Sequence, residues 1–442
     1  MTLLVPLNVQ DGGGDQVRSL LSPGALWKEF EANRLPCVRH TWEIELISVY
    51  LDSQDYSTLS NPVLSEDLKN IKEKLKAYAE SGGVSFYFSS LIVSEASPSE
   101  PAAIQHAIRR GDFLTAICKR HALRFNHDVV NDEVRNLVEG NSAKVEAICK
   151  DGDWFPAVDF PEPTPLAELA KEAVNEEAAA RGLTREQRRA AQRKVLKGGG
   201  LKPDVLKAIR EMNASVYISS VTEQYPMQAW HAEVLSRYCF GEATKEEATN
   251  AFRDALRDPC WLMRWFANKE ELAHPLVAMV RKPGREIGEK FRGLVGLAEE
   301  IRSLEHLLED SPLSRERWNK LLDKGIVDVA TGVAKQLFPG WSGEFDIEDV
   351  TRRCPGLTAM ISSIYSSVWD NVSGSRKALP SDSQFPDAMH AVYAPYVDLF
   401  RADRYMAPHI QKHVGVGGAQ VVSKLADLPK AIEQRLRAAS PV

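Results

Sequence analysis

Residues 382–407, DSQFPDAMHAVYAPYVDLFRADRYMA, predict a short helix followed by a buried strand, with an acidic residue beside each. Pro386 suits the first turn of a helix, which places Asp387 near the positive end of the helix dipole, where an ionised carboxylate is favoured. The apolar run YVDLF is rich in strand-forming residues and opens into a polar loop that carries Asp403. Because ligands of open α/β sheets bind at the carboxyl ends of the strands, both acids are predicted site residues.

Two earlier stretches repeat this arrangement. EIELISVYLDSQDYS predicts a strand that ends at Asp52, and VSFYFSSLIVSEAS predicts a strand followed by a short helix that carries Glu95. Strand and helix patterns alternate in this part of the chain, which favours a parallel sheet in an α/β fold. We therefore expect the acids of all these segments to converge on one crevice at the edge of the sheet.

Length and pattern together predict an α/β core that is split by a large all-α insertion. The chain has 442 residues, more than a usual single domain, and its strand patterns are confined to two parts. The predicted organisation is an N-terminal arm (1–38), a first half of the core (39–130), a helical insertion (131–345) and a second half of the core (346–442).

Composition favours an ordinary globular protein of the cytoplasm. The chain is 44% hydrophobic and 26% charged, and no stretch has the apolar length of a membrane span, so no membrane is expected as a partner. Its six cysteines are dispersed without metal-finger spacing, as is typical of reduced thiols in a cytosol. The formal net charge of −6 means that any contact with nucleic acid requires a local basic surface.

Such a surface is predicted between Arg181 and Arg210, where basic residues exceed acidic ones by eight. A nucleic-acid backbone would bind there in a salt-sensitive way. The alternatives are ion pairs with the acidic stretch that precedes it, which contains Glu172 and Glu176, or a charged surface that serves solubility. The candidate nucleic-acid-binding residues are Arg185, Arg188, Arg189, Arg193, Lys194 and Lys197.

Clustered carboxylates repel one another unless a cation neutralises them, so the predicted crevice favours Mg²⁺ or Mn²⁺. In order and local context its acids resemble those of the PIN-domain nucleases, which have a small parallel sheet between helices. The resemblance implies that Asp52 and Asp387 are direct metal ligands and that Glu95 and Asp403 bind directly or through water. Asp398 is a substitute for the fourth acid. The departure from the family is the separation of 292 residues between Glu95 and Asp387.

Two further residues accompany these acids. Ser53 follows Asp52, as a hydroxyl residue does in the resembled family. His390 lies one helical turn after Asp387, where it either orients that acid, touches a phosphate or simply packs in the helix.

The resemblance implies a metal-dependent endoribonuclease with RNA as substrate. Many bacterial members of the family act as toxins or in defence, so an inhibitor or antitoxin protein is an expected partner. Two alternatives stay open: a structure-specific DNase, and a catalytically silent PIN-fold protein that binds nucleic acid or regulates. The sequence does not distinguish RNA from DNA, because that choice depends on contacts to the 2′-hydroxyl and on strand shape.

Overall fold

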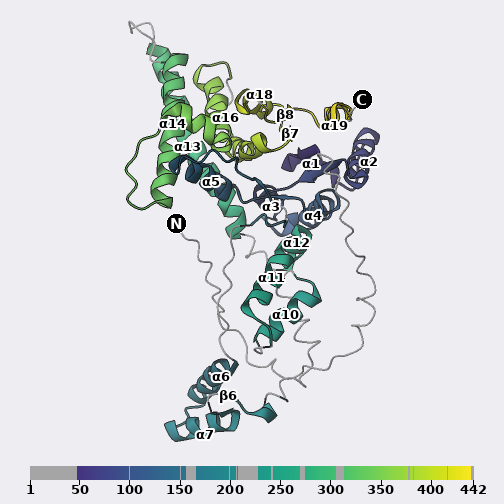
Figure 1. Ribbon diagram of the computed structural model, residues 1–442, viewed down its shortest axis with the longest axis vertical. Helices are drawn as coiled ribbons and strands as arrows, with labels where there is room; N and C mark the ends of the chain where they lie inside the picture. The colour runs from purple at the N-terminus through teal and green to yellow at the C-terminus, as the bar shows by residue number, and fades with distance from the viewer. Residues whose placement is uncertain are drawn as a thin grey trace. The chain divides into compact units, whose positions relative to one another are not determined.

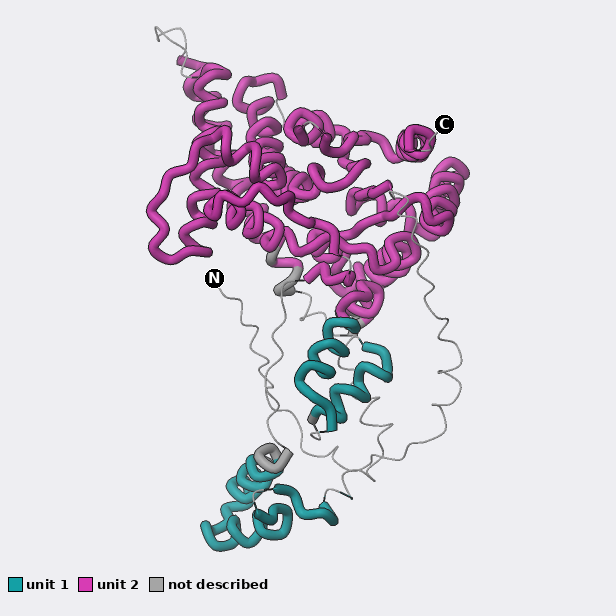
Figure 2. Tube along the Cα trace, viewed as in Figure 1, with its two compact units in different colours: residues 1–40, 159–255 teal, residues 41–158, 256–442 magenta. Residues whose placement is uncertain are grey.

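The computed structural model describes most of the chain after residue 46, as residues 47–98, 100–149, 151–155, 166–198, 200–205, 207, 227–239, 242–268, 274–304, 313–376, 379–381, 383–415 and 417–439. The chain divides into two compact units. Unit 1 comprises residues 1–40 and 159–255, and unit 2 comprises residues 41–158 and 256–442 (Figure 2). The predicted N-terminal arm lies outside the described residues.

Unit 2 contains a parallel sheet of four strands in the order β2-β1-β7-β8. The strands are β1 (Ile47–Tyr50), β2 (Val84–Tyr87), β7 (Leu399–Arg401) and β8 (Gln420–Val422). Every residue of β1 and β2 is buried, as expected for parallel strands that helices cover on both faces. The predicted α/β class, with a parallel sheet flanked by helices, is therefore confirmed (Figure 1).

The first part of unit 2 alternates strands and helices as predicted. After β1 come α1 (Ser53–Leu59) and α2 (Glu66–Ser81), and after β2 come α3 (Ser90–Ala96), the 3-10 turn η2 (Pro101–Ala103) and α4 (Ile104–Cys118). The hydroxyl of Ser65 accepts the N–H of Leu68 and so caps α2, which ends at Gly82 in a left-handed conformation with φ 77°.

A short antiparallel pair, β3 (Ala122–Leu123) and β4 (Ile148–Cys149), follows α4 and encloses α5 (Asn126–Val138). A parallel bridge between Phe88 and Ala122 joins this pair to the side of β2.

The last part of unit 2 supplies the other half of the sheet. Its elements are α15 (Ile347–Arg353), α16 (Pro355–Val372), α17 (Gln384–His390), the 3-10 turn η5 (Ala391–Tyr396), α18 (Met406–His413), the turn η6 (Leu425–Asp427) and α19 (Leu428–Ala439). The predicted helix at Pro386 begins two residues earlier than expected. It changes to 3-10 geometry after His390, and this turn takes in Pro395.

Three helices of the predicted insertion belong to unit 2 and pack on the sheet-bearing part. They are α12 (Pro259–Asn268), α13 (His274–Leu304) and α14 (Arg315–Leu337). Helix α12 packs on α4, α13 packs on α3, α16 and α17, and α14 packs on α5 and α16 (Figure 1). The unit boundaries therefore differ from the predicted insertion of 131–345, because the apolar faces of these amphipathic helices are buried against the core.

Unit 1 contains helices and a small hairpin. Helices α6 (Leu166–Ala180) and α7 (Arg185–Val195) pack together, and β5 (Leu196–Lys197) pairs with β6 (Gly200–Leu201). Helices α10 (Ala229–Cys239) and α11 (Lys245–Leu256) follow, with a small buried cluster that includes Met227, Ala232 and Ala255. Across the described parts of both units, no helix combines the length and apolar character that crossing a bilayer requires.

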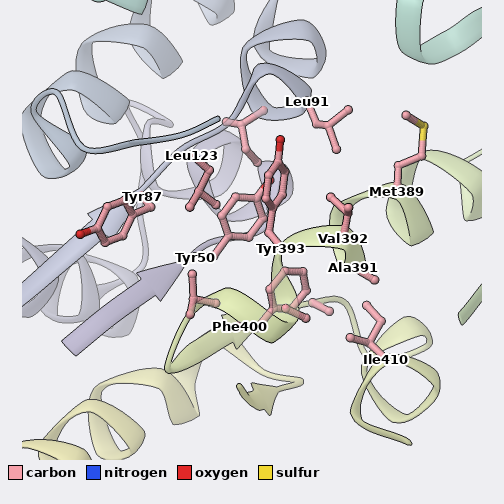
Figure 3. Close-up of a cluster of buried hydrophobic side chains, with 14 of the residues drawn as sticks. Tyr50, Tyr87, Leu91, Leu123, Met389, Ala391, Val392, Tyr393, Phe400 and Ile410 are labelled. Carbon is pink, nitrogen blue, oxygen red and sulfur yellow. The ribbon is translucent and has the colours of Figure 1, made fainter. Parts of the chain in front are cut away.

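Aromatic packing joins strands β1 and β7 of unit 2. The ring of Tyr50 in β1 stacks on that of Phe400 in β7, with centroids 5.2 Å apart, and lies 5.5 Å from the ring of Tyr393 (Figure 3). All three side chains are fully buried. The core beneath the sheet edge is therefore built from residues far apart in the sequence.

A buried carboxylate joins α5 to α16. Glu133 accepts hydrogen bonds from the backbone N–H groups of Gly356, at 2.6 Å, and Leu357, at 3.0 Å, and from the hydroxyl of Tyr396. These N–H groups belong to the first turn of α16, where an acceptor is needed and negative charge is favoured. Glu133 therefore fixes the start of the helix that carries α17 and α18 on its surface.

Candidate acid site

Three of the predicted acids line one small cleft at the carboxyl ends of β1 and β7. Asp52 follows β1, Asp403 follows β7, and Asp387 lies in the first turn of α17. The cavity volume is about 10 Å³, which is room for roughly one water-sized group. Its other lining residues are Tyr50, His390, Phe400, Arg401, Ala402 and Met406.

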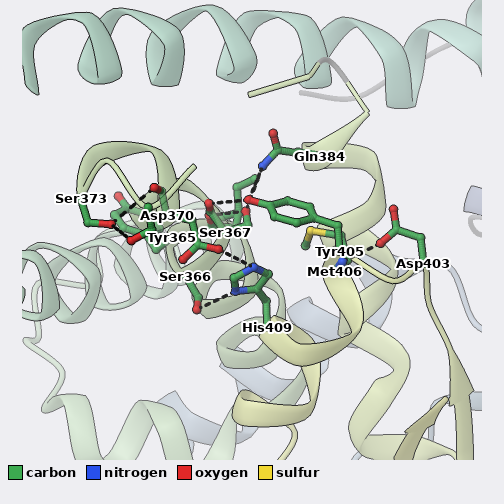
Figure 4. Close-up of polar contacts among 12 residues, drawn as sticks. Tyr365, Ser366, Ser367, Asp370, Ser373, Gln384, Asp403, Tyr405, Met406 and His409 are labelled. Carbon is green, nitrogen blue, oxygen red and sulfur yellow. Dashed lines mark hydrogen bonds and ion pairs between the residues drawn. The ribbon is translucent and has the colours of Figure 1, made fainter. Parts of the chain in front are cut away.

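Local hydrogen bonds hold two of these acids. Asp52 caps α1, because its Oδ1 accepts the N–H of Gln54 at 2.8 Å. Asp403 Oδ1 accepts the N–H of Met406, the first residue of α18, at 2.5 Å (Figure 4). Each acid thus stands between the end of a strand and the start of the next helix, as the strand-then-acid pattern predicts.

Glu95 reaches the same place through His390. The Nε2 of His390 lies 3.3 Å from Oε1 of Glu95, and its Nδ1 lies 2.6 Å from the hydroxyl of Tyr50. The Tyr50 hydroxyl also contacts Ser89 Oγ at 2.7 Å, and Ser53 makes a hydrogen bond to Glu95. His390 therefore bridges an acid of α3 to the sheet.

The pKa values show that the four predicted acids share one electrostatic environment. Burial raises the pKa of Asp387 to about 8, and the neighbouring carboxylates add to this effect. Those carboxylates are, in decreasing order of effect, Glu95, Asp52 and Asp403. Segments separated by 292 residues in the sequence therefore meet at one edge of the sheet.

Burial also raises the pKa of Asp52, although the N–H of Gln54 and the charge of His390 offset part of the effect. Burial alone would raise the pKa of Glu95, but the charge of His390, its hydrogen bond and that of Ser53 lower it overall. For His390, burial lowers the pKa, but the charge and hydrogen bond of Glu95, together with the charges of Asp52 and Asp387, raise it overall. A neutral Asp387 thus lies beside an ionised Glu95 paired with His390.

A second polar network orders the helices around the cleft (Figure 4). The Tyr405 hydroxyl donates to the carbonyl of Ser367 in α16 at 2.7 Å, and Gln384 in α17 lies 3.4 Å from the same hydroxyl. His409 in α18 bridges Ser366 Oγ, at 3.0 Å, and Asp370 Oδ2, at 3.3 Å. These contacts fix the segment of Asp403 against the helix of Asp387.

The sequence analysis missed a buried ion pair at the cleft. Arg401, the last residue of β7, lies 3.2 Å from Asp55 in α1, and their side chains are 10% and 3% exposed. Asp55 Oδ2 and the Nε and Nη1 of Arg401 have no hydrogen-bond partner within the described residues. Burial raises the pKa of Asp55 to about 7, and Arg401 offsets only part of this. The signal in the sequence is the position of Arg401 at the carboxyl end of the strand, where ligand sites of open α/β sheets lie.

Asp398 does not join the other acids. It precedes β7, and its Oδ2 accepts hydrogen bonds from the N–H and Oγ of Ser48, at 2.8 and 2.7 Å. Ser48 lies two residues before Tyr50, so Asp398 is at the amino end of the strands. The prediction that Asp398 substitutes for the fourth ligand is therefore wrong, because an acid before a parallel strand faces the edge opposite to one after it.

No ready-made metal site is present in the described part of the chain, where no group of three or more His, Cys, Asp or Glu side chains has suitable geometry. The donor chemistry of the cleft is nevertheless that of a hard cation site, since three carboxylates line it. Hydrogen bonds to Asp52, Asp403 and Glu95 occupy some of the oxygens that ligation requires.

The predicted nucleic-acid-binding residues lie in unit 1 on α7 and β5. No residue of α7 is buried, and Arg185, Arg189 and Arg193 are exposed. Lys194 and Lys197 are also exposed, and Arg188 is half-buried. Within the described residues no ion pair joins these six side chains to an acid, and the pair formed nearby is Arg181 with Glu177. The alternative of ion pairs with the acidic stretch therefore accounts for little of the basic excess.

Searches of protein-family models, curated proteins and solved structures find no significant match to the chain. The functional argument therefore depends on the geometry of the cleft.

Proposed function

We propose that the chain is a metal-dependent phosphodiesterase of PIN-like architecture that cleaves RNA internally. The observation that carries the proposal is the meeting of Asp52, Asp387 and Asp403 in one small cleft, with Glu95 reaching it through His390. The order of these acids along the chain is that of the resembled nucleases. A toxin or defence role, held in check by an antitoxin or inhibitor, is the setting that this resemblance suggests.

Asp52, Asp387 and Asp403 would hold Mg²⁺ or Mn²⁺, with Glu95 completing the set directly or through water. The bound cation would orient and activate a water and stabilise charge on the phosphate. The raised pKa of Asp387, about 8, means that this acid holds a proton at neutral pH without a cation. Cation binding must displace this proton, so the affinity for Mn²⁺ is expected to rise with pH up to about 8.

The chain's own residues position the acids. Tyr50 and Glu95 hold the two ring nitrogens of His390, which fixes the ring and aims one Glu95 oxygen. Arg401 places a positive charge beside Asp52 and Asp55, which limits the mutual repulsion of the carboxylates. These contacts hold the acids close together.

The absence of a ready-made ligand group among the described residues favours a second candidate, a catalytically silent protein of the same fold that binds nucleic acid. A structure-specific DNase differs from the first proposal only in substrate. One set of assays distinguishes both alternatives from the proposed ribonuclease.

The test is incubation of labelled RNA and DNA with the protein and Mn²⁺ or Mg²⁺, beside Asp387→Asn and Asp398→Asn. We expect RNA cleavage that Asp387→Asn lowers at least about a hundredfold, as loss of a metal ligand does. Asp398→Asn is the matched control and should retain most activity, because that acid lies at the other end of the strands.

Cleavage of DNA alone would favour the DNase. Undiminished cleavage by Asp387→Asn would show that another protein in the preparation is responsible. Binding without cleavage under every condition would favour the silent protein.

A further inference from the structure

A second cavity lies next to Glu95 and is separate from the acid cleft. Its volume is about 410 Å³, and its polar lining residues are Ser57 and Ser60 of the α1 region, Glu100, and His106 and Arg110 of α4. Arg110 connects the two sites, because its Nη1 donates to the backbone carbonyl oxygen of Glu95 at 3.3 Å and to Ser57 Oγ at 3.4 Å. A group bound in this cavity would therefore be a neighbour of the acids.

The guanidinium of Arg110 retains unused capacity for hydrogen bonding. Its Nε is buried and has no hydrogen-bond partner within the described residues. Buried donors of this kind are rare, because burial without an acceptor costs free energy. The Arg110 side chain also lines the cavity, where an acceptor would contact the more accessible part of its guanidinium.

A second arginine stands nearby. Burial and the charge of Arg281, in α13, lower the pKa of Arg110, while Glu95 opposes this effect. Helix α13 packs on α3, which brings the exposed side chain of Arg281 to the Glu95 side of the cleft. Two guanidinium groups that repel each other are stabilised when an anion binds between or beside them.

The lining chemistry selects the kind of anion. A guanidinium offers a planar fork of N–H donors that matches phosphate oxygens, and serine hydroxyls and an imidazole add further donors. We propose that the cavity lined by Ser57, His106 and Arg110 binds a phosphate of a nucleic-acid strand, next to the phosphodiester presented to the acids. The class of ligand rests on the proposed function, and the cavity itself does not.

Because of Glu100, the proposal predicts opposite effects on binding when a negative and a positive charge are removed from the cavity. Its exposed carboxylate lines the same cavity and disfavours an anion. Removal of this charge should therefore strengthen phosphate binding, whereas loss of the Arg110 charge should weaken it. A loss of fold weakens binding and cannot produce both results.

The experiment measures binding of a short fluorescein-labelled single-stranded RNA by anisotropy in EDTA, where cleavage is absent. We expect Arg110→Gln to weaken binding about tenfold, as loss of a charge-assisted phosphate contact does. The slope of log affinity against log salt should fall by about 0.7. Glu100→Gln should strengthen binding about twofold, an electrostatic effect near the surface. Inorganic phosphate should compete with the RNA more weakly for Arg110→Gln than for the wild type.

Controls separate this site from general charge and from folding. Lys335→Gln removes an exposed positive charge from α14 and should bind like the wild type. His106→Ala alters an exposed lining residue, so it should weaken binding about twofold even if Arg110→Gln unfolds. The proposal is overturned if the wild type binds no RNA, or if His106→Ala and Glu100→Gln both bind as the wild type does.

The same variants distinguish failure of this site from failure of the proposed function. Asp387→Asn should bind RNA normally in EDTA while losing cleavage with Mn²⁺. If the wild type cleaves nothing but Arg110→Gln and Glu100→Gln shift binding in opposite directions, the phosphate site stands without the nuclease. If Asp387→Asn abolishes cleavage and Arg110→Gln binds and cleaves normally, the nuclease stands without this site.

Discussion

The acid site of unit 2 and the basic segment of unit 1 (residues 185–197) carry charge in opposite ways. At the acid site, carboxylates from distant parts of the chain lie close together, and histidine, arginine and backbone N–H groups hold them. In the basic segment the charges lie on one exposed helix and the hairpin after it, with no buried residue in the helix. Bringing like charges together below the surface costs stability, and spreading them on an exposed helix costs little. A cluster of buried like charges that the fold maintains in spite of this loss of stability indicates a functional site.

Breaking one ion pair at the acid site and one exposed pair that precedes the basic segment should give the largest contrast. Asp55→Asn leaves Arg401 buried without its partner, and arginine cannot shed its charge, so we expect a loss of about 3–5 kcal/mol in the free energy of unfolding. Glu177→Gln, which breaks the exposed pair with Arg181, should cost less than about 0.5 kcal/mol. Urea denaturation of each variant gives the two values. Similar losses in both would contradict the contrast.

The pH dependence of the free energy of unfolding should come from buried carboxylates of unit 2 and not from the exposed basic segment. Burial raises the pKa of Glu133 to about 7, despite its three hydrogen bonds. Below about pH 4.5 the residue is protonated in both folded and unfolded chains, so it imposes no penalty. Between about pH 4.5 and 7 only the unfolded chain loses the proton, and stability falls as pH rises, by about 3 kcal/mol in all.

Glu133→Gln should make the slope shallower by the share of this residue, because glutamine does not titrate, while Asp55 and Asp387, whose pKa values are also raised, keep their shares. The matched control is Glu139→Gln, an exposed position at the end of the same helix, which should leave the slope unchanged. Unfolding free energies across this pH range check both. A slope in Glu133→Gln as steep as that of the wild type would show that Glu133 does not contribute to the pH dependence.

His390 tests whether the contacts behind the acids matter for the proposed function. Its removal by His390→Ala releases Glu95, so the Mn²⁺ concentration for half-maximal cleavage should rise about 10- to 100-fold. Tyr50→Phe removes only the hydrogen bond between the Tyr50 hydroxyl and Nδ1 of His390. It should therefore raise the Mn²⁺ concentration for half-maximal cleavage by a smaller factor. The exposed His127 supplies the control variant, His127→Ala, which should match the wild type. Equal behaviour of His390→Ala and His127→Ala would show that His390 only packs.

The smallest effect is expected from the basic segment. Substitution of Arg188, Arg189 and Arg193 with glutamine should weaken RNA binding and lower its salt slope by about 2, as loss of three phosphate contacts to a single strand does. The free energy of unfolding should change little, since none of these side chains is paired with an acid in the described residues. The salt dependence of anisotropy measures the first effect. An unchanged slope would assign the segment to solubility.

The sequence allowed the sheet and its acid edge to be predicted because both follow from local patterns. Continuous apolar runs gave β1 and β2, and an acid directly after a strand must lie at its carboxyl end. Asp398 was misplaced because two acids flank one short strand, and the choice between them depends on which end of the strand each occupies. The direction of the strand places Asp398 before it, at its amino end, and Asp403 after it, at its carboxyl end.

Other features depend on tertiary contacts that no local pattern contains. The pairing of Arg401 with Asp55, and of Glu133 with the start of α16, joins residues on different elements. The bounds of the two compact units could not be derived from local patterns for the same reason. An amphipathic helix shows in sequence that it has an apolar face but not which surface that face will cover, and α13 and α14 cover the core.

The pairing of β1 with β7 also determines when, during translation, the acid site can form. Ser48 and Asp398, which bond to each other across these strands, are 350 residues apart. At about 5–20 residues per second, a ribosome needs about 20 to 70 s to add the second after the first. Throughout that interval the growing polypeptide has only part of its acid edge, so a harmful activity located there would stay dormant until translation is nearly complete. The unpaired side of β1 would meanwhile need shielding by chaperones.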